Sequence, residues 1–148
     1  MREKIIYVGI DAGVFTGVSV RHNWSGELIL KTLSFWKAFN FINSIIIHSE
    51  INIVVVIEDV TQNKPVFSNK LGKNARINLK IAQNVGGVKR ETQLWIDYFE
   101  SKGVEVIRVK PTKKSQTKLD KKIFEKLTGY KGRCSQHARD ATMLIIGR

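Results

Sequence analysis

The chain opens on a stretch that reads Tyr7-Val8-Gly9-Ile10-Asp11-Ala12-Gly13-Val14-Phe15-Thr16-Gly17. An apolar run ends on Asp11, a turn punctuated by glycine follows, and a second β-rich run begins at Val14. Strands of this kind normally lie in the middle of a sheet, so Asp11 is expected at the rim of a rigid core. An ionised carboxylate in such a place is costly unless a positive charge meets it. The stretch therefore predicts a positive group beside Asp11.

Five strands are expected from the pattern of apolar and β-branched residues. They cover residues 5–11, 14–21, 27–33, 51–60 and 104–109. The connections between the first three are short, which implies an antiparallel meander, and the second of them is Asn23-Trp24-Ser25-Gly26. The run at 51–60 is almost continuously β-branched, as expected for a strand covered on both faces.

Helical spacing appears between these strands. In residues 35–48 the spaced apolar residues are Trp36, Phe39, Ile42 and Ile46. A longer helix carries one stripe through Ile77, Ile81, Val85, Val88, Thr92, Trp95 and Phe99. Gly86 and Gly87 lie on or beside this stripe. Each glycine weakens a helix by about 1 kcal/mol, so close backbone packing is expected there.

Two short helices are expected near the C-terminus. Leu119, Ile123 and Leu127 suggest the first, which Gly129 ends. Ser135 is the expected N-cap of a last helix that runs to about residue 146. Between the strand at 51–60 and the long helix, residues 61–73 are polar and are expected to form an exposed, mobile loop.

The resulting order is β-β-β-α-β-α-β-α-α. It predicts an α/β fold with a mixed five-stranded sheet, in which an antiparallel meander is followed by parallel strands joined by right-handed crossovers. Helices are expected on both faces of this sheet. With 148 residues and 43% hydrophobic content, the chain is expected to form a single domain over residues 1–148.

The charge balance favours a polyanionic partner. The chain has 25 Lys and Arg against 13 Asp and Glu, a formal net charge of +12. Solubility alone needs a charge of only about 2 to 8, so nucleic acid is the expected partner. No run of about 18 apolar residues occurs, so no membrane span is expected. Cys134 is the only cysteine, which excludes an intrachain disulfide and fits a reducing cytoplasm.

Acidic residues at three places could meet at one rim of the sheet. Asp11 and the pair Glu58-Asp59 each close a strand, and His137 and Asp140 share one face of the last helix. Neighbouring strand residues point to opposite faces, so only one of Glu58 and Asp59 can share the side of Asp11. Carboxylates with one imidazole suit Mg²⁺ or Mn²⁺. Two such ions about 3.5–4 Å apart can promote hydrolysis of a phosphodiester by water.

Each of these places also has a simpler explanation. An Asp before a glycine turn is common turn chemistry. Glu58-Asp59 fits an exposed strand end, and His137 with Asp140 fits the start of a helix. Their joint occurrence in a strongly basic chain favours the metal site.

The chain resembles the RuvC-type Holliday junction resolvases of the ribonuclease-H-like superfamily. The resemblance covers almost the whole chain. It is carried by Gly9-Ile10-Asp11-Ala12-Gly13 with Thr16-Gly17, Val56-Ile57-Glu58, the segment Leu79-Lys80-Ile81-Ala82-Gln83-Asn84-Val85-Gly86-Gly87-Val88, Val109-Lys110-Pro111 and His137-Ala138-Arg139-Asp140-Ala141. The opening Asp and Gly turn is also similar to that of sugar kinases and actin-like ATPases, whereas the glycine-bearing helix and the closing motif are more specific.

The resemblance implies an enzyme that nicks two opposed strands of a four-way DNA junction symmetrically. It implies a homodimer, with the glycine-bearing helix as the dimer face, in the cytoplasm of a bacterial or phage-infected cell. The implied metal ligands, for two ions of Mg²⁺ or Mn²⁺, are Asp11, Glu58, His137 and Asp140. Many relatives carry Asp at the position of His137, and some carry His.

The resemblance also implies DNA contacts. Basic residues after the fifth strand contact the scissile phosphate in such enzymes, and here these are Lys110, Lys113 and Lys114. A loop aromatic probes the junction core in the family, and Phe67 is the candidate, although it could equally anchor its loop. Basic residues expected to bind DNA nearby are Lys64, Lys70, Lys73 and Arg76.

Two other functions remain open from the residues alone. One is a different ribonuclease-H-like nuclease that acts on RNA or an RNA–DNA hybrid. The other is a basic module that binds junctions without cleaving them.

Overall fold

A mixed five-stranded sheet forms the centre of the molecule, in a computed structural model that describes residues 2–62, 75–111 and 120–148. The strands are β1 (Ile5–Asp11), β2 (Thr16–His22), β3 (Leu28–Leu33), β4 (Asn52–Glu58) and β5 (Glu105–Val109), in the order β3-β2-β1-β4-β5. β1 and β2 pair antiparallel, as do β2 and β3, whereas β1–β4 and β4–β5 are parallel. The predicted α/β class, and the meander followed by parallel strands, are confirmed.

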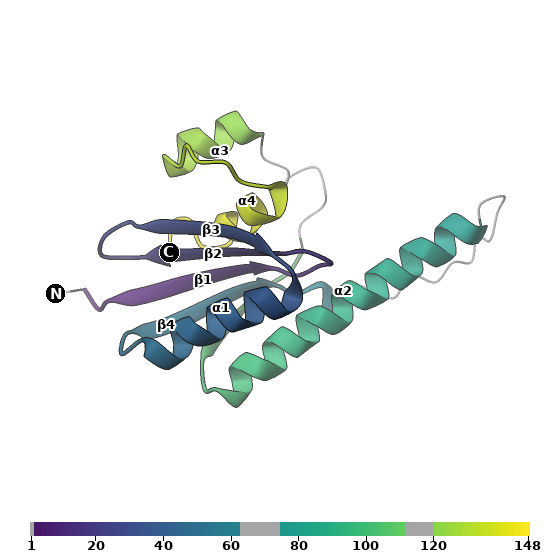
Figure 1. Cartoon of the computed structure of the whole chain (residues 1–148), viewed down its shortest axis with the longest axis horizontal. Coiled ribbons are helices and arrows are strands. Elements are labelled where there is room, and N and C mark those ends of the chain that lie inside the picture. Colours follow the sequence, from purple (N-terminus) through teal and green to yellow (C-terminus); the bar gives the residue numbers. More distant parts are fainter. Residues whose placement is uncertain (1, 63–74, 112–119) are drawn as a thin grey trace.

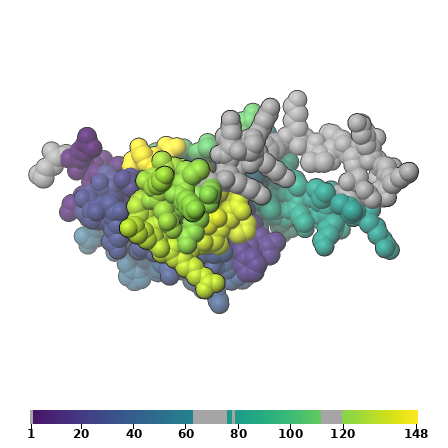
Figure 2. All heavy atoms as spheres, turned by 90° about the horizontal axis from the view of Figure 1, so that it is seen from above, coloured from purple at the N-terminus to yellow at the C-terminus, as the bar shows by residue number. Residues whose placement is uncertain are grey.

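Helices cover both faces of this sheet (Figure 1). They are α1 (Phe35–His48), α2 (Ala75–Ser101), α3 (Lys121–Thr128) and α4 (Gln136–Met143), with a short 3-10 helix η1 (Val60–Gln62) after β4. α1 and α2 lie on one side, and α4 packs against β1, β2 and β3 on the other. Figure 2 shows α3 and α4, green to yellow, over this second face. None of the helices within the described ranges is long and apolar enough to cross a membrane.

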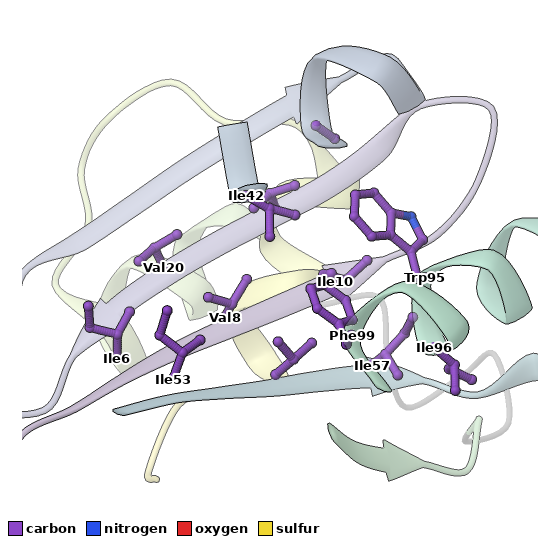
Figure 3. Packing of buried hydrophobic residues seen from close by; sticks show 13 residues of the cluster. Ile6, Val8, Ile10, Val20, Ile42, Ile53, Ile57, Trp95, Ile96 and Phe99 are labelled. Carbon is purple, nitrogen blue, oxygen red and sulfur yellow. The ribbon is translucent and has the colours of Figure 1, made fainter. Parts of the chain in front are cut away.

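The main hydrophobic core fills the space between the sheet and the helices α1 and α2. Alternate strand residues such as Val8, Ile10 and Ile57 point into it and are fully buried. Ile42 of α1 meets them from above, together with Trp95 and Phe99 of α2 (Figure 3). Because Ile10 and Ile57 are held in this core, the residues that follow them, Asp11 and Glu58, must point to the opposite face.

Helix α2 is only half supported by the core. The C-terminal part of its predicted apolar stripe is buried, at Thr92, Trp95 and Phe99. Ile77 and Ile81 belong to the same stripe but are exposed, because the N-terminal part of the helix projects beyond the sheet (Figure 1). The helix therefore packs on the sheet along only part of its length.

Several predicted boundaries also shift. β4 ends at Glu58 rather than at residue 60, because η1 begins at Val60. α4 ends at Met143 and continues as a turn rather than as helix to residue 146. Trp36 has the helical spacing of its neighbours but is exposed, and Ala38 and Ile42 are the buried residues of α1. Most of the loop expected at residues 61–73 lies outside the described ranges, as does Leu119.

α4 sits unusually close to the sheet, and two glycines allow it. A Cβ added at Gly9 would overlap the carbonyl of Ala141, and one added at Gly17 would overlap the carbonyl of His137. Thr142 Oγ1 lies 2.9 Å from Ser19 Oγ, a buried contact that fixes the helix on β2. The close approach therefore depends on the absence of side chains at these two strand positions.

Gly17→Ala should lower the free energy of unfolding by about 1–3 kcal/mol, because the new methyl group meets rigid backbone rather than a movable side chain. Urea denaturation measures this loss. The matched control is Gly13→Ala, whose Cβ would meet only the Phe15 carbonyl at an ordinary 3.5 Å, and its effect should stay within about 0.5 kcal/mol. Equal losses in the two variants would contradict the close seating of α4.

Candidate functional site

Three elements bring acidic side chains to one rim of the sheet. Asp11 ends β1 and Glu58 ends β4, and these strands are parallel neighbours in which Ile10 pairs with Ile57. Their carboxyl ends therefore meet at the same edge, and both acids point to the face that carries α4. Ser135 caps α4 by accepting from the Ala138 N–H, as predicted, and His137 in the first turn of this helix contacts Asp11.

His137 and Asp11 are in direct contact although 126 residues separate them. His137 Nδ1 lies 2.9 Å from Asp11 Oδ2. Burial raises the pKa of Asp11 above its ordinary value, although the hydrogen bond and the charge of His137 act in the opposite direction. The His137 imidazole is the hydrogen-bonding partner that the structure gives to the Asp11 carboxylate.

Glu58 lies in the electrostatic field of two further acids. Burial raises its pKa first, and the charges of Asp11 and Asp140 raise it further. Asp140 lies one helical turn beyond His137 on α4. The carboxylates of Asp11 and Asp140 thus both lie close enough to repel that of Glu58.

Asp59 has a different, structural task. It is buried, and its carboxylate accepts from the backbone and hydroxyl of Thr61 and, at 3.0 Å, from Gln62 Nε2. Burial alone would raise the pKa of Asp59, but these hydrogen bonds and the charge of Arg108 bring it below its ordinary value. Asp59 shapes the exit from β4, and Glu58 is the acid that shares the side of Asp11.

The donor set fits a hard divalent cation. Asp11, Glu58 and Asp140 offer carboxylate oxygens and His137 offers a ring nitrogen, which suits Mg²⁺ or Mn²⁺. Among the described residues, no group of three or more such side chains is already arranged to hold an ion. Asp11 and His137 are hydrogen-bonded to each other, so holding an ion would require them to give up that contact. The charges of Asp11 and Asp140 add to burial in raising the pKa of Glu58, and a bound cation would offset these two charges.

The predicted basic residues are only partly visible. Lys110 is exposed and follows Val109, which pairs with Glu58, so it stands at the same rim. Arg76 is exposed in the first turn of α2. The remaining predicted residues lie outside the described ranges: Lys64, Phe67, Lys70, Lys73, Lys113 and Lys114.

Glu91 is a residue that the sequence did not single out. It lies on α2, and its carboxylate accepts a hydrogen bond from the Gly13 N–H in the turn after β1. Burial raises the pKa of Glu91, and its Oε2 is buried without a hydrogen-bond partner in the described part of the chain. The hydrogen bond from the Gly13 N–H to the Glu91 carboxylate holds the turn that follows Asp11 in place. In the sequence, Glu91 was marked only as an acid next to Thr92, beside the apolar stripe of the long helix.

No protein-family model matches this chain, and no curated protein matches its sequence.

Glu58→Gln should stabilise the protein in the presence of a chelator. The pKa of Glu58 is raised in the folded state, so its ionised form costs stability above that pKa and the cost vanishes below its unfolded value near 4.5. The gain should therefore be present at pH 8. It should disappear towards pH 4.

Urea denaturation of the parent and Glu58→Gln across pH 4 to 8 measures this gain. Glu50→Gln removes an exposed carboxylate near the opposite end of the sheet and should show no such gain. A Glu58→Gln protein that is less stable than the parent at pH 8 would show that the Glu58 carboxylate is held by favourable partners.

Proposed function

We propose that this protein is a divalent-metal-dependent endodeoxyribonuclease of ribonuclease-H-like fold, which resolves four-way (Holliday) DNA junctions by paired symmetric nicks. The observation that carries the proposal is the contact between His137 and Asp11 beside Glu58, at a rim of the sheet in a chain of net charge +12. The strand order, with a meander followed by parallel strands, agrees with the family that the sequence resembles.

The chain's own residues have distinct parts in this hydrolysis. Asp11, Glu58 and Asp140 would hold the cations through oxygen, and His137 would bind in its neutral form. Bound divalent ions supply the positive charge that activates water and stabilises the leaving oxygen. Lys110 is exposed at the rim and is suited to neutralise a phosphate of the cut strand. No covalent enzyme intermediate is part of the proposal.

The position of the acids explains why they are suited to this work. They sit at the ends of β1 and β4, and the residues before them, Ile10 and Ile57, are buried in the core. Groups that are held in place before the substrate arrives need no reorganisation during the reaction. A rigid rim is thus favourable for hydrolysis by positioned water.

Asp11→Asn should lower junction cleavage by at least about 100-fold, since several kcal/mol of transition-state stabilisation depend on the cations. Junction binding in chelator should stay within about twofold, because binding relies on the basic surface. The measurement is a digest of a synthetic four-way junction with Mg²⁺, Mn²⁺ or chelator, followed by mapping of the nicks.

Parallel digests of duplex DNA and an RNA–DNA hybrid test the substrate class. Asp97→Asn removes an exposed carboxylate on α2 that accepts from Gln93, and it should cleave like the parent. If the protein cleaves the RNA–DNA hybrid in preference to the junction, it is a nuclease with a different substrate. If it binds the junction without metal and cleaves nothing, it is a junction-binding module and not a nuclease.

We infer that a second copy of the chain covers the projecting part of α2. Ile77, Leu79 and Ile81 are exposed there, and no described atom lies within 4 Å of a Cβ added at Gly86 or Gly87. A helical segment of this length is marginal on its own in water, so an uncovered apolar stripe favours a partner. Two symmetric nicks in one junction require two active sites, which a homodimer provides.

A shallow depression beside the stripe gives this partner a place to pack. It has a volume of about 240 Å³ and is lined by Val60, Asn84, Val85, Val88 and Lys89. Its lining is mostly apolar, so a side chain from the facing helix would be desolvated there. Such pockets are where interface residues contribute most to binding.

The double variant Ile77→Ser and Ile81→Ser should weaken dimerisation by about 10- to 100-fold, as expected when two central interface residues are removed. Light scattering after gel filtration measures the molar mass against concentration. Ile47→Ser changes a residue that is 63% exposed at the far end of α1 and should leave the mass unchanged. A parent protein that stays monomeric at all concentrations would contradict the inference.

A further inference from the structure

Two consecutive apolar residues stand out at the tip of the turn between β1 and β2. Val14 is 80% exposed and Phe15 is 56% exposed. Both follow Asp11 by only a few residues and precede the paired residue Gly17. Full burial of a Phe side chain contributes about 1.5–3 kcal/mol, and an exposed Phe lacks most of this free energy. The exposure of Phe15 therefore suggests that its side chain has a partner outside the described part of the chain.

The exposure is not a consequence of a loose turn. Asp11 and Gly17 pair across the base of the turn, so both of its ends are fixed in the sheet. Ala12 packs against the core, and the Gly13 N–H donates to the carboxylate of Glu91 on α2. The base is anchored on two sides while the tip at residues 14 and 15 is left in water. Figure 1 shows this turn at the end of the sheet beside α2.

The tip lies within reach of whatever binds at the acid cluster. Phe15 follows Asp11 by four residues, so its Cα lies at most about 14 Å from that of Asp11. Successive nucleotides of one DNA strand are about 3.4 Å apart along the duplex axis. A strand whose phosphate lies at Asp11 can therefore reach the tip within a few nucleotides.

A nucleobase fits this tip better than a protein partner does. Stable protein interfaces bury about 1,200–2,000 Å² in total, which two residues cannot provide. One aromatic ring stacked on a base contributes about 1–3 kcal/mol without needing a wide surface. The net charge of +12 also attracts a polyanion to the molecule.

We propose that the Val14–Phe15 tip is a base-stacking contact for the DNA strand that is cut at the Asp11 rim. Phe15 packs on the face of an unstacked nucleobase close to the scissile phosphate, and Val14 fills the space beside it. Glu91 acts as a positioning residue, because it holds the turn through Gly13. The inference rests on the proposed function and adds a substrate contact to it.

The test uses a four-way junction with 2-aminopurine at successive positions on each side of the mapped cut. In the Asp11→Asn background, which binds without cutting, stacking on Phe15 should change the 2-aminopurine fluorescence at one or two positions. Phe15→Ala should abolish that change and, in the otherwise unaltered protein, lower cleavage by about 5- to 150-fold, the equivalent of the stacking free energy. Phe15→Trp should retain both signals.

Two controls separate this contact from a loss of folding or of binding in general. Ile47→Ala removes an equally exposed apolar side chain at the remote end of α1 and should leave fluorescence and cleavage unchanged. Far-ultraviolet circular dichroism and the urea midpoint of Phe15→Ala should match those of the parent, because an exposed side chain contributes little to stability.

Three outcomes would overturn the stacking contact. If Phe15→Ala cleaves like the parent and shows the same fluorescence, the tip does not touch DNA, while the nuclease proposal stands. If Phe15→Ala changes the molar mass but leaves junction binding per dimer intact, the tip belongs to a protein interface. If the parent binds no junction at all, the proposed function fails and the contact fails with it.

Discussion

The arrangement of the site depends on the contact of one short helix with two strands. α4 lies so close to β1 and β2 that neither Gly9 nor Gly17 has room for a Cβ. This seating places His137 against Asp11 and brings the next turn of the helix over the end of β4. A methyl group at either glycine would push the helix outwards, and the hydrogen bond between the His137 ring and the Asp11 carboxylate would be lost. The site is therefore specified by the absence of two side chains as much as by the presence of four.

The acid cluster is locally unfavourable, and the sheet beneath it compensates. Burial and the neighbouring acids raise the pKa of Glu58, and burial raises that of Asp11 despite the contact with His137. Each residue follows a fully buried isoleucine, Ile57 and Ile10 respectively. The free energy gained by burying these neighbours holds the acids in a place that they would leave if the rim were free to relax. Buried carboxylates with raised pKa values, held by a rigid support, are typical of functional sites.

Much of this geometry could be predicted because it follows from local rules. The alternation of strand residues and the short turns predicted the bounds that β1 has in the structure. Because neighbouring strand residues point to opposite faces, only one of Glu58 and Asp59 could face Asp11. The i, i+3 spacing of His137 and Asp140 on α4 likewise followed from helix geometry. The features that were missed depend on tertiary contacts. Periodicity marked Ile77 and Ile81 as one stripe with Trp95, but it could not show where the sheet ends beneath the helix.

Gly9, Gly17 and Glu91 were missed for the same reason, because their roles depend on tertiary contacts. Gly9 and Gly17 lie within predicted strands, and nothing marked them as points of contact, since a sequence does not show which backbone approaches a Cα from across the fold. Glu91 was not singled out, because its partner is a backbone N–H 78 positions earlier in the chain, at Gly13. Trp36 was misplaced for a related reason: its spacing fitted the apolar stripe, but the stripe that packs runs through Ala38 and Ile42.

α2 links the two features of the molecule that point to partners. Its C-terminal half is locked in the core by Trp95 and Phe99, and its N-terminal half projects with an uncovered apolar stripe. Glu91 lies between the halves and holds the turn that follows Asp11. A helix transmits position along its length because each turn is hydrogen-bonded to the next. In the proposed dimer, the partner that packs on the projecting half would thus be fixed relative to the acid cluster through one rigid element. Two cuts placed symmetrically in one DNA junction need that fixed separation, and a flexible linker between the two halves of α2 would not provide it.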